Sequence, residues 1–257
     1  MSQLSPADPI DPQPQDAQLS MVYQLKITLK DSRPPIWRRV LVSSNSTFWQ
    51  LHCVIQDLFG WQHEHLHAFI RQGKPGDERV FIEMPRERDD DWFFGKDFTN
   101  ETARELKRLY PTVPTTWYYH EQTALVGEWL TPSRPKIRYC YDFGDNWYHD
   151  IVLEKMLDPG EPDIRDLTLP WDLGGKRQAP AEDSRGQYID DCTSLIRAGQ
   201  DRSGELWRWL VDDVGVKRAE RLVRRAEREA VTEYQPIRRF RDPAVMYLRS
   251  RDMGMFD

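Results

Sequence analysis

The sequence predicts an α+β fold: a mainly antiparallel sheet with helices packed on one face, plus a helical C-terminal subdomain. Three observations predict it. Apolar and polar residues alternate over residues 23–29, as they do in a half-buried strand. Thr47 and Gln50 have the spacing of a capping box, which opens an amphipathic helix. Residues 137–154 hold two strand-like runs on either side of Gly144-Asp145-Asn146, a composition typical of a β-hairpin.

The other N-terminal elements follow from turn and periodicity signals. Pro34-Pro35 ends the first strand, and residues 36–42 form a second one. The helix after Thr47 buries one stripe of large apolar residues, and Gly60 stands where a left-handed C-terminal cap is needed. Strands are then predicted at residues 65–70 and 80–82. The order is therefore strand, strand, helix, strand, strand.

Three domain segments are predicted. Residues 1–20, with four prolines and three aspartates, read as a disordered tail. Residues 21–200 form the α+β domain, with an excursion at residues 84–134 that contains short helices near 101–109 and 124–130. Residues 201–257 form a helical, basic extension, because helical periodicity continues over 205–211 and 216–231.

Composition and charge limit the setting of the protein. The three cysteines are far apart and lack paired metal-ligand spacing, which indicates free thiols in a reducing compartment. The sequence shows neither a signal-peptide pattern nor a membrane-length apolar run, so a cytoplasmic protein without membrane contact is expected. A protein partner and a nucleic acid are both open, as is the oligomeric state.

Histidines and aspartates near the hairpin suggest a metal site. His65 and His67 are two residues apart on a predicted strand, so their rings share a face. His149 on the return strand, with Asp142 and Asp145 at the turn, supplies further donors for zinc or manganese. The alternative is structural: imidazoles packed among aromatic rings and carboxylates that accept turn amides. In either case Phe143, Trp147 and His149 are expected to be buried, His149 at least in part.

The C-terminal segment suggests a second kind of site. The net charge is −6, yet residues 217–251 hold 11 Lys/Arg and 5 Asp/Glu, a local balance of +6. A nucleic-acid interface through Arg221, Arg224, Arg225 and Arg228 is one hypothesis. Solvation of the basic helix, or its docking on the acidic body of the same chain, is the other.

With these elements in view, the chain resembles the plasmid pRiA4b ORF-3-like family over about residues 21–200. The hairpin carries the most specific match, Tyr141-Asp142-Phe143-Gly144-Asp145 with Trp147, His149, Ile151 and Glu154. The other matches are Arg33-Pro34-Pro35-Ile36-Trp37-Arg38-Arg39, Phe59-Gly60-Trp61 and His65-Leu66-His67-Ala68-Phe69. The segment from Gly175 to Asp183 resembles a degenerate form of the family's Gly-Lys-Arg-Ala-Cys-Pro-Pro-Glu-Asp run. Here Gln178 and Ala181 stand where Cys and Pro are expected, so a metal site built from those thiols is absent.

The resemblance implies an α+β fold and an origin in mobile elements, where some members are called transposon passenger or resolvase-like proteins. It implies no settled activity. The sequence lacks a phosphate-cradling glycine loop, a nucleophile elbow and a resolvase-type serine motif. An accessory or interaction module is therefore the leading hypothesis. A metal-dependent hydrolase or nuclease and a nucleic-acid-binding protein are the alternatives.

Overall fold

One eight-stranded sheet organises the computed structural model, which describes residues 20–72, 79–84, 100–110, 112, 115–229 and 233–252. In space the strands follow the order β5-β4-β3-β6-β7-β1-β2-β8. Their bounds are β1 Val22–Leu29, β2 Ile36–Ser43, β3 His67–Gln72, β4 Arg79–Glu83, β5 Thr116–His120, β6 Lys136–Tyr141, β7 Trp147–Leu157 and β8 Trp171–Lys176. Every pairing is antiparallel except that of β4 with β5. The predicted α+β class is confirmed.

The predicted hairpin of β6 and β7 lies at the centre of the sheet, beside the paired strands β1 and β2. β1 pairs with β2 on one side and with β7 on the other, and β7 returns antiparallel to β6. The predicted tail, apart from Ser20, lies outside the described residues, and so do residues 85–99 of the excursion. The described part of the excursion contains helix α2 (Asn100–Leu109), strand β5 and the short helix α3 (Val126–Trp129).

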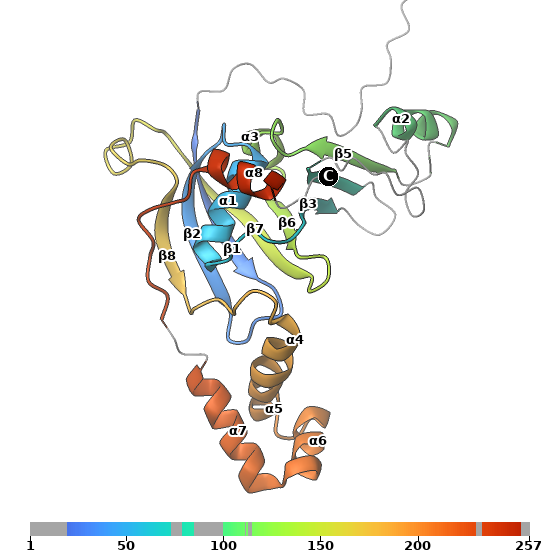
Figure 1. Cartoon of the computed structure of the whole chain (residues 1–257), viewed down its shortest axis with the longest axis vertical. Helices are drawn as coiled ribbons and strands as arrows, with labels where there is room; N and C mark the ends of the chain where they lie inside the picture. The colour runs from blue at the N-terminus through green and yellow to red at the C-terminus, as the bar shows by residue number, and fades with distance from the viewer. Residues whose placement is uncertain are drawn as a thin grey trace, which may run out of the picture.

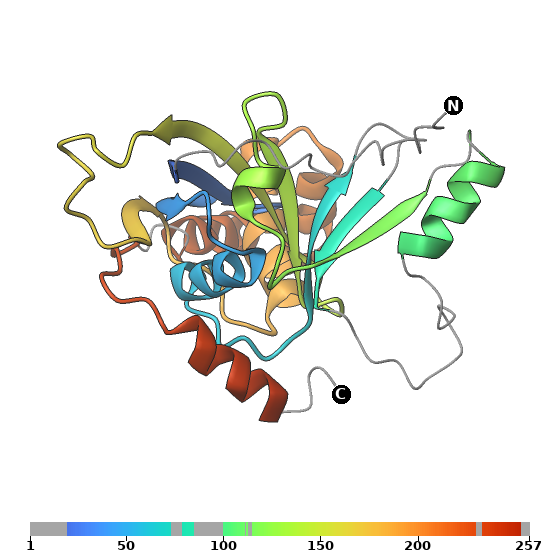
Figure 2. The same cartoon turned by 90° about the horizontal axis from the view of Figure 1, so that it is seen from above.

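Helix α1 (Phe48–Phe59) packs on one face of the sheet, as Figures 1 and 2 show. Thr47 and Gln50 form the predicted capping box, and Gly60 ends the helix with φ 73°. The face under α1 holds the main core, in which Leu25, Ile27 and Ile151 are fully buried. On the opposite face Glu154 accepts hydrogen bonds from Gln24 at 2.7 Å and from Arg39.

A second layer of helix covers α1. Residues 233–252, which we call the C-terminal strap, run back along the molecule and end in α8 (Pro243–Asp252). Both views place α8 beside α1, on the side away from the sheet (Figures 1 and 2). Asp57 of α1 anchors the strap, because its carboxylate accepts Arg241 N at 2.7 Å and also pairs with the Arg241 guanidinium.

The remaining helices form a group of their own. α4 (Arg185–Gln187), the π-helical stretch η1 (Tyr188–Ser194) and α5 (Leu195–Gln200) follow one another without a break. They pack with α6 (Glu205–Val214) and α7 (Val216–Glu229) around Ala198, Leu210 and Ala219. Figure 1 shows this group extending from one end of the sheet, away from α1 and α8. Among the described residues, no helix has the length and hydropathy needed to cross a membrane.

Candidate metal centre

Helix α1 carries a histidine into the core. His52 lies one turn after Phe48, on the helix face that is buried against the sheet, and is 0% exposed. Its Nδ1 lies 2.7 Å from the hydroxyl of Tyr139 on β6, which also accepts Gln56 Nε2 at 3.1 Å. These contacts direct the other ring nitrogen, Nε2, towards the loop that follows the helix.

The loop between α1 and β3 and the first residue of β3 place two more histidines next to His52. His63 has φ 63°, and its backbone N–H donates to the Gln56 side chain at 2.9 Å, so the chain turns inward after Trp61. Nδ1 of His63 is in direct contact with Nε2 of His52. His67 is the first residue of β3, and its ring stacks on that of His52 with centroids 3.5 Å apart.

One ligand atom from each of His52, His63 and His67 lies within 4.8 Å of the other two, and all three residues are buried. A carboxylate lies beside this group, against His67. Glu121, the residue after β5, is 0% exposed, and its Oε2 lies 2.7 Å from His67 Nε2. Its Oε1 is buried without a hydrogen-bond partner among the described residues. We call these four residues the buried histidine centre.

Burial decides the charge state of two of the imidazoles. It lowers the pKa of His52 well below the ordinary value, with the neighbouring charges of His67 and His63 acting in the same direction. Burial also lowers the pKa of His63 to about 3, followed by the effects of His67 and Arg241. Both rings are therefore neutral at neutral pH, and each keeps a lone pair for a metal ion.

Trp49 and the C-terminal strap close the centre from above. The Trp49 indole stacks on His52 at 5.3 Å and meets His63 edge-on at 5.1 Å. Its Nε1 donates to Pro243 O at 3.0 Å, and the Tyr247 ring packs against it at 5.8 Å. The buried histidine centre therefore lies inside the protein, between the sheet and the helices that cover it.

A second, more open group lies at the hairpin turn. His65 Nε2 is 2.9 Å from Asp183 Oδ1, and His65 Nδ1 is 3.9 Å from Asp142 Oδ2. The His65 side chain is 29% exposed and that of Asp183 64%. Asp142 Oδ1 accepts the N–H groups of Gly144 and Asp145 at 2.8 and 3.2 Å, so it also holds the turn. We call His65, Asp142 and Asp183 the surface triad.

The structure divides the predicted metal ligands between different places. His65 and Asp142 meet in the surface triad, whereas His67 turns into the buried histidine centre. The two histidines do not share a face as expected, because β3 begins only at His67 and His65 lies in the preceding loop. Asp145 accepts Arg185 N at 3.1 Å and ties the turn to the start of α4.

His149 lies apart from both groups. It is fully buried as expected, with its ring edge-on to Phe59 at 4.5 Å and to Trp61 at 5.3 Å. Neither ring nitrogen has a side-chain hydrogen-bond partner among the described residues, and burial lowers the pKa to about 3. Neither Asp142 nor Asp145 therefore hydrogen-bonds to the His149 ring.

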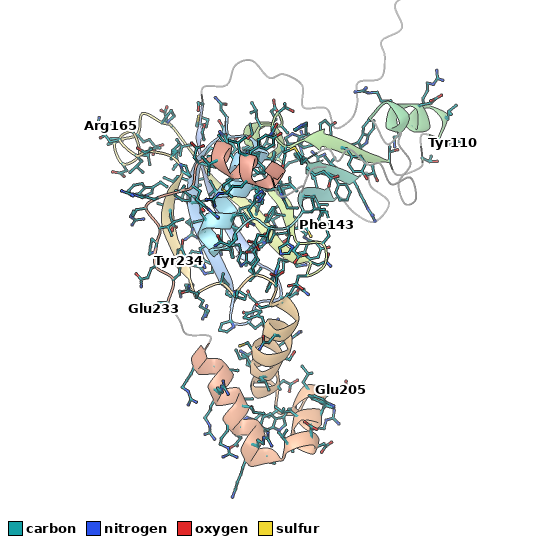
Figure 3. All side chains as sticks on the ribbon, in the orientation of Figure 1. Tyr110, Phe143, Arg165, Glu205, Glu233 and Tyr234 are labelled. Atoms are coloured by element: carbon teal, nitrogen blue, oxygen red, sulfur yellow. The ribbon has the colours of Figure 1, made fainter. Side chains whose placement is uncertain are left out.

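The expected burial of Phe143 is wrong, whereas that of Trp147 is confirmed. Phe143 is 38% exposed at the hairpin tip, where Figure 3 labels it, and Trp147 is 1% exposed. Asp142 adopts φ 57°, which takes the chain out of the strand before Phe143. The strand, and with it the alternation of side chains, therefore ends at Tyr141, two residues earlier than the sequence pattern indicates.

Sequence reasoning did not find His52, His63 or Glu121, and it noted Asp183 only as the end of the family-like segment. For His52 a signal was available, because it interrupts the apolar stripe of α1 and a buried helix face rarely carries a titratable group without a partner. For His63 the signal was its place in a run of three alternate histidines, 63, 65 and 67. Glu121 comes from a loop far along the sequence and has no local pattern, whereas Asp183 ends the segment that resembles the family's run.

The four predicted nucleic-acid contacts lie together in the C-terminal helical group. Arg221, Arg224, Arg225 and Arg228 are all on α7, and all four side chains are exposed. The docking of this helix on the acidic sheet, which the sequence left open, is not what the structure shows. Instead α7 packs on α5, α6 and η1.

Fold and site together define a class of protein: an α+β protein with one mainly antiparallel sheet and a group of buried histidines beneath its first helix. This chain belongs to the plasmid pRiA4b ORF-3-like protein family, whose model matches residues 21–217. The family predicted from the sequence motifs is confirmed.

Two other proteins are similar to this chain, one in sequence and one in structure. The chain is 26% identical over 193 residues to "Uncharacterized protein y4hQ" of Sinorhizobium fredii (strain NBRC 101917 / NGR234), a match that spans 74% of this chain and 81% of y4hQ. It is also similar to the crystal structure of "Protein of Unknown Function MM3350" from Methanosarcina mazei Go1. That match has a TM-score of 0.51 and 28% identity, and covers 75% of this chain and 90% of MM3350. The structural match supports the fold, and neither name assigns a chemistry.

Proposed function

We propose that this chain is a metal-binding accessory module in which the buried histidine centre holds one divalent ion, preferably zinc. The observation that carries the proposal is the donor set. Three imidazole nitrogens lie within 4.8 Å of one another in the core, and a buried carboxylate beside them has an oxygen without a hydrogen-bond partner among the described residues. Such groups are costly to bury unless something satisfies them.

The neutral imidazole rings and the buried carboxyl group favour a bound divalent cation over a purely structural packing of these side chains. Glu121 places a carboxyl group where it is 0% exposed, and burial keeps the neighbouring rings of His52 and His63 neutral. The ring of His67 reaches only one of its two oxygens. A cation bound by the rings and the carboxylate satisfies the free Glu121 oxygen.

The donor chemistry selects the metal. Three imidazole nitrogens and one carboxylate oxygen suit zinc, which takes four such ligands in a tetrahedron. Manganese, the other ion considered from the sequence, prefers sites dominated by oxygen. The donor set of His52, His63, His67 and Glu121 is therefore better matched to zinc.

The closed surroundings assign the ion a structural role. Structural zinc sites use four protein ligands, whereas catalytic sites keep one position open for water or substrate. Trp49 and the C-terminal strap cover the buried histidine centre, which holds three imidazole donors and, against His67, the Glu121 carboxylate. The ion therefore joins α1, the loop to β3 and the end of β5, and its binding energy adds to folding. This favours an accessory or interaction module, and the family name supports an origin in plasmids or other mobile elements.

Metal analysis of untagged protein, purified without chelators or immobilised metal, tests the proposal. We expect about one zinc per chain, because the centre holds one ion. The His52→Ala and His67→Ala variants are expected to lose it, and His65→Ala, which removes the ligand of the surface triad, is expected to retain it. Substoichiometric metal in the unmodified protein, or loss only in His65→Ala, contradicts the proposal.

One observation favours a second candidate, hydrolase or nuclease chemistry. The surface triad sets a part-exposed imidazole between two carboxylates, an arrangement used in acid–base catalysis. We rank it second because both nitrogens of His65 already face carboxylates and Asp142 is engaged in the turn. Hydrolysis of bis(p-nitrophenyl) phosphate that His65→Ala abolishes and His120→Ala leaves intact supports this candidate. Absence of turnover with added zinc or manganese eliminates it for phosphodiesters.

A further inference from the structure

Helix α7 has one face fixed in the C-terminal helical group. Ala219, Val223 and Ala226 are at most 3% exposed and point towards the neighbouring helices. The approach to α5 is close: a Cβ added to Gly199 would lie 2.3 Å from Val223 Cγ1. The apolar stripe of α7 is thus already covered by its own chain, and the rotation of the helix about its axis is fixed.

The opposite face of α7 is entirely basic. Helical geometry of 3.6 residues per turn puts Lys217, Arg221, Arg224 and Arg228 within about 60° of one another, with Arg218 and Arg225 beside them. All six side chains are exposed. The acidic residues Glu220, Glu227 and Glu229 fall on the flanks, where Glu220 pairs with Arg224 at 3.3 Å and with Arg202 at 3.5 Å. We call the six cations the outer basic face.

The dimensions of this face match a phosphate backbone. From Lys217 to Arg228 the helix rises about 16 Å, at 1.5 Å per residue. Double-stranded DNA carries one negative charge per about 1.7 Å of its axis, so several phosphates come within reach of the face at once. Arginine predominates, and its guanidinium binds phosphate oxygens in pairs.

Two other partners fit less well. A lipid surface requires an amphipathic helix with an exposed apolar face, and the apolar face of α7 is buried. A protein interface has an apolar, charge-poor centre, whereas every residue on the outer basic face is Lys or Arg. Figure 1 places α7 at the far end of the molecule from α1 and α8, so the acidic sheet body does not cover it.

We propose that the outer basic face of α7 binds the phosphate backbone of double-stranded nucleic acid, side-on and without reading the base sequence. Contacts to phosphates fix position and carry no sequence information, which suits a row of arginines with no Asn or Gln among them. The proposal does not depend on the buried histidine centre, which lies in another part of the fold.

Fluorescence anisotropy of the full-length protein with labelled duplexes of about 20 base pairs tests it, with DNA and RNA in separate arms. We expect binding at about 50 mM salt, independent of sequence, that weakens steeply by about 200 mM. Arg221→Ala/Arg228→Ala should weaken binding about tenfold and reduce the salt slope by about two. The matched control is Arg134→Ala/Arg165→Ala, which removes two exposed arginines from loops of the sheet body and should change nothing.

Binding to either duplex with this dependence on α7 supports the proposal, and the two arms identify the nucleic acid. No binding at low salt overturns it. An equal effect of the two double variants also overturns it, since the attraction would then be diffuse. Competition by poly-glutamate as effective as that by DNA points instead to an acidic protein, and binding to anionic vesicles but not to duplexes points to a membrane. Far-UV circular dichroism of all variants checks that α7 remains folded.

Discussion

The imidazole rings of His52 and His67 lie face to face in the core, with their centroids 3.5 Å apart and their planes 10° from parallel. Two protonated rings at this distance would repel each other, so the stack requires that at least one be neutral. It joins α1 to β3, and each ring reaches a further partner: His52 touches His63, and His67 touches Glu121. The ion that we propose at this junction would link α1, the loop to β3 and the end of β5.

Removing the ion should therefore lower stability. Because the site is formed only in the folded chain, metal binding free energy is folding free energy. We expect a chelator to lower the Tm of the unmodified protein, and zinc added back to restore it. In His67→Ala the chelator should have no further effect, because the site is already lost. A Tm that is the same with and without chelator in the unmodified protein contradicts this expectation.

The C-terminal strap should control how fast the ion leaves. Arg241 holds it through Asp57 and through Trp61 O at 2.6 Å. Arg241→Ala leaves the Asp57 carboxylate without its cation and loosens the strap above Trp49, so a chromogenic chelator should extract zinc at least about tenfold faster. Arg238→Ala is the matched control, since Arg238 binds the same strap to Asp172 O at 3.1 Å, away from the centre. Equal extraction rates in the two variants would show that the strap is no barrier.

The hairpin contains two aromatic residues that differ in burial, so their contributions to stability can be compared. Trp147 is 1% exposed among Trp61 and the other core rings, whereas Phe143 is 38% exposed at the turn. Trp147→Ala should lower the free energy of unfolding by about 3–5 kcal/mol, and Phe143→Ala should change it by no more than about 0.5 kcal/mol. Urea denaturation measures both. A large loss in Phe143→Ala would mean that the tip packs against something in solution.

His149 should make the fold sensitive to acid. The ordinary histidine pKa is about 6.5, and burial lowers that of His149 to about 3. Between about pH 3 and pH 6.5 the His149 ring is therefore protonated in the unfolded chain and neutral in the folded chain. Stability from the neutral ring is therefore complete above pH 6.5 and is lost as pH falls towards 3, by about 1.4 kcal/mol per pH unit.

The His149→Phe variant isolates this effect, because it retains the buried histidine centre. Between about pH 6 and pH 4 its free energy of unfolding should fall less steeply than that of the unmodified protein, by about 1.4 kcal/mol per pH unit. Urea titrations at several pH values measure the difference. Parallel curves for the two proteins would show that His149 titrates alike in the folded and unfolded chains.

Local signals in the sequence predicted local structure well. The capping box of Thr47 and Gln50, the glycine cap at Gly60 and the turn after Asp142 each depend on residues within a few positions of one another. Those signals, with the alternation in β1 and β7, were enough for the α+β class and the hairpin of β6 and β7.

The outer strands of the sheet, β5 and β8, and the position of Glu121 depend on parts of the chain that are far apart in sequence. β5 pairs parallel to β4 after a long crossover, and that pairing places Glu121 beside His67. β8 contains Gly174-Gly175, which disfavours a strand on propensity. At Gly175 an added Cβ would lie 2.4 Å from Trp37 O, so the glycine permits the close approach to β2. No short window of sequence predicts these strand pairings or the position of Glu121.

X-ray absorption spectroscopy at the zinc edge, on untagged protein as purified, tests the central claim most directly. We predict a first shell of about four nitrogen and oxygen neighbours at about 2.0–2.1 Å, with the outer scattering of several imidazole rings. His52→Ala should lose part of that imidazole signal, and His65→Ala should retain it. A shell with sulfur at about 2.3 Å, as Cys53 next to His52 would give, contradicts the account. So does a spectrum of hydrated zinc without imidazole scattering.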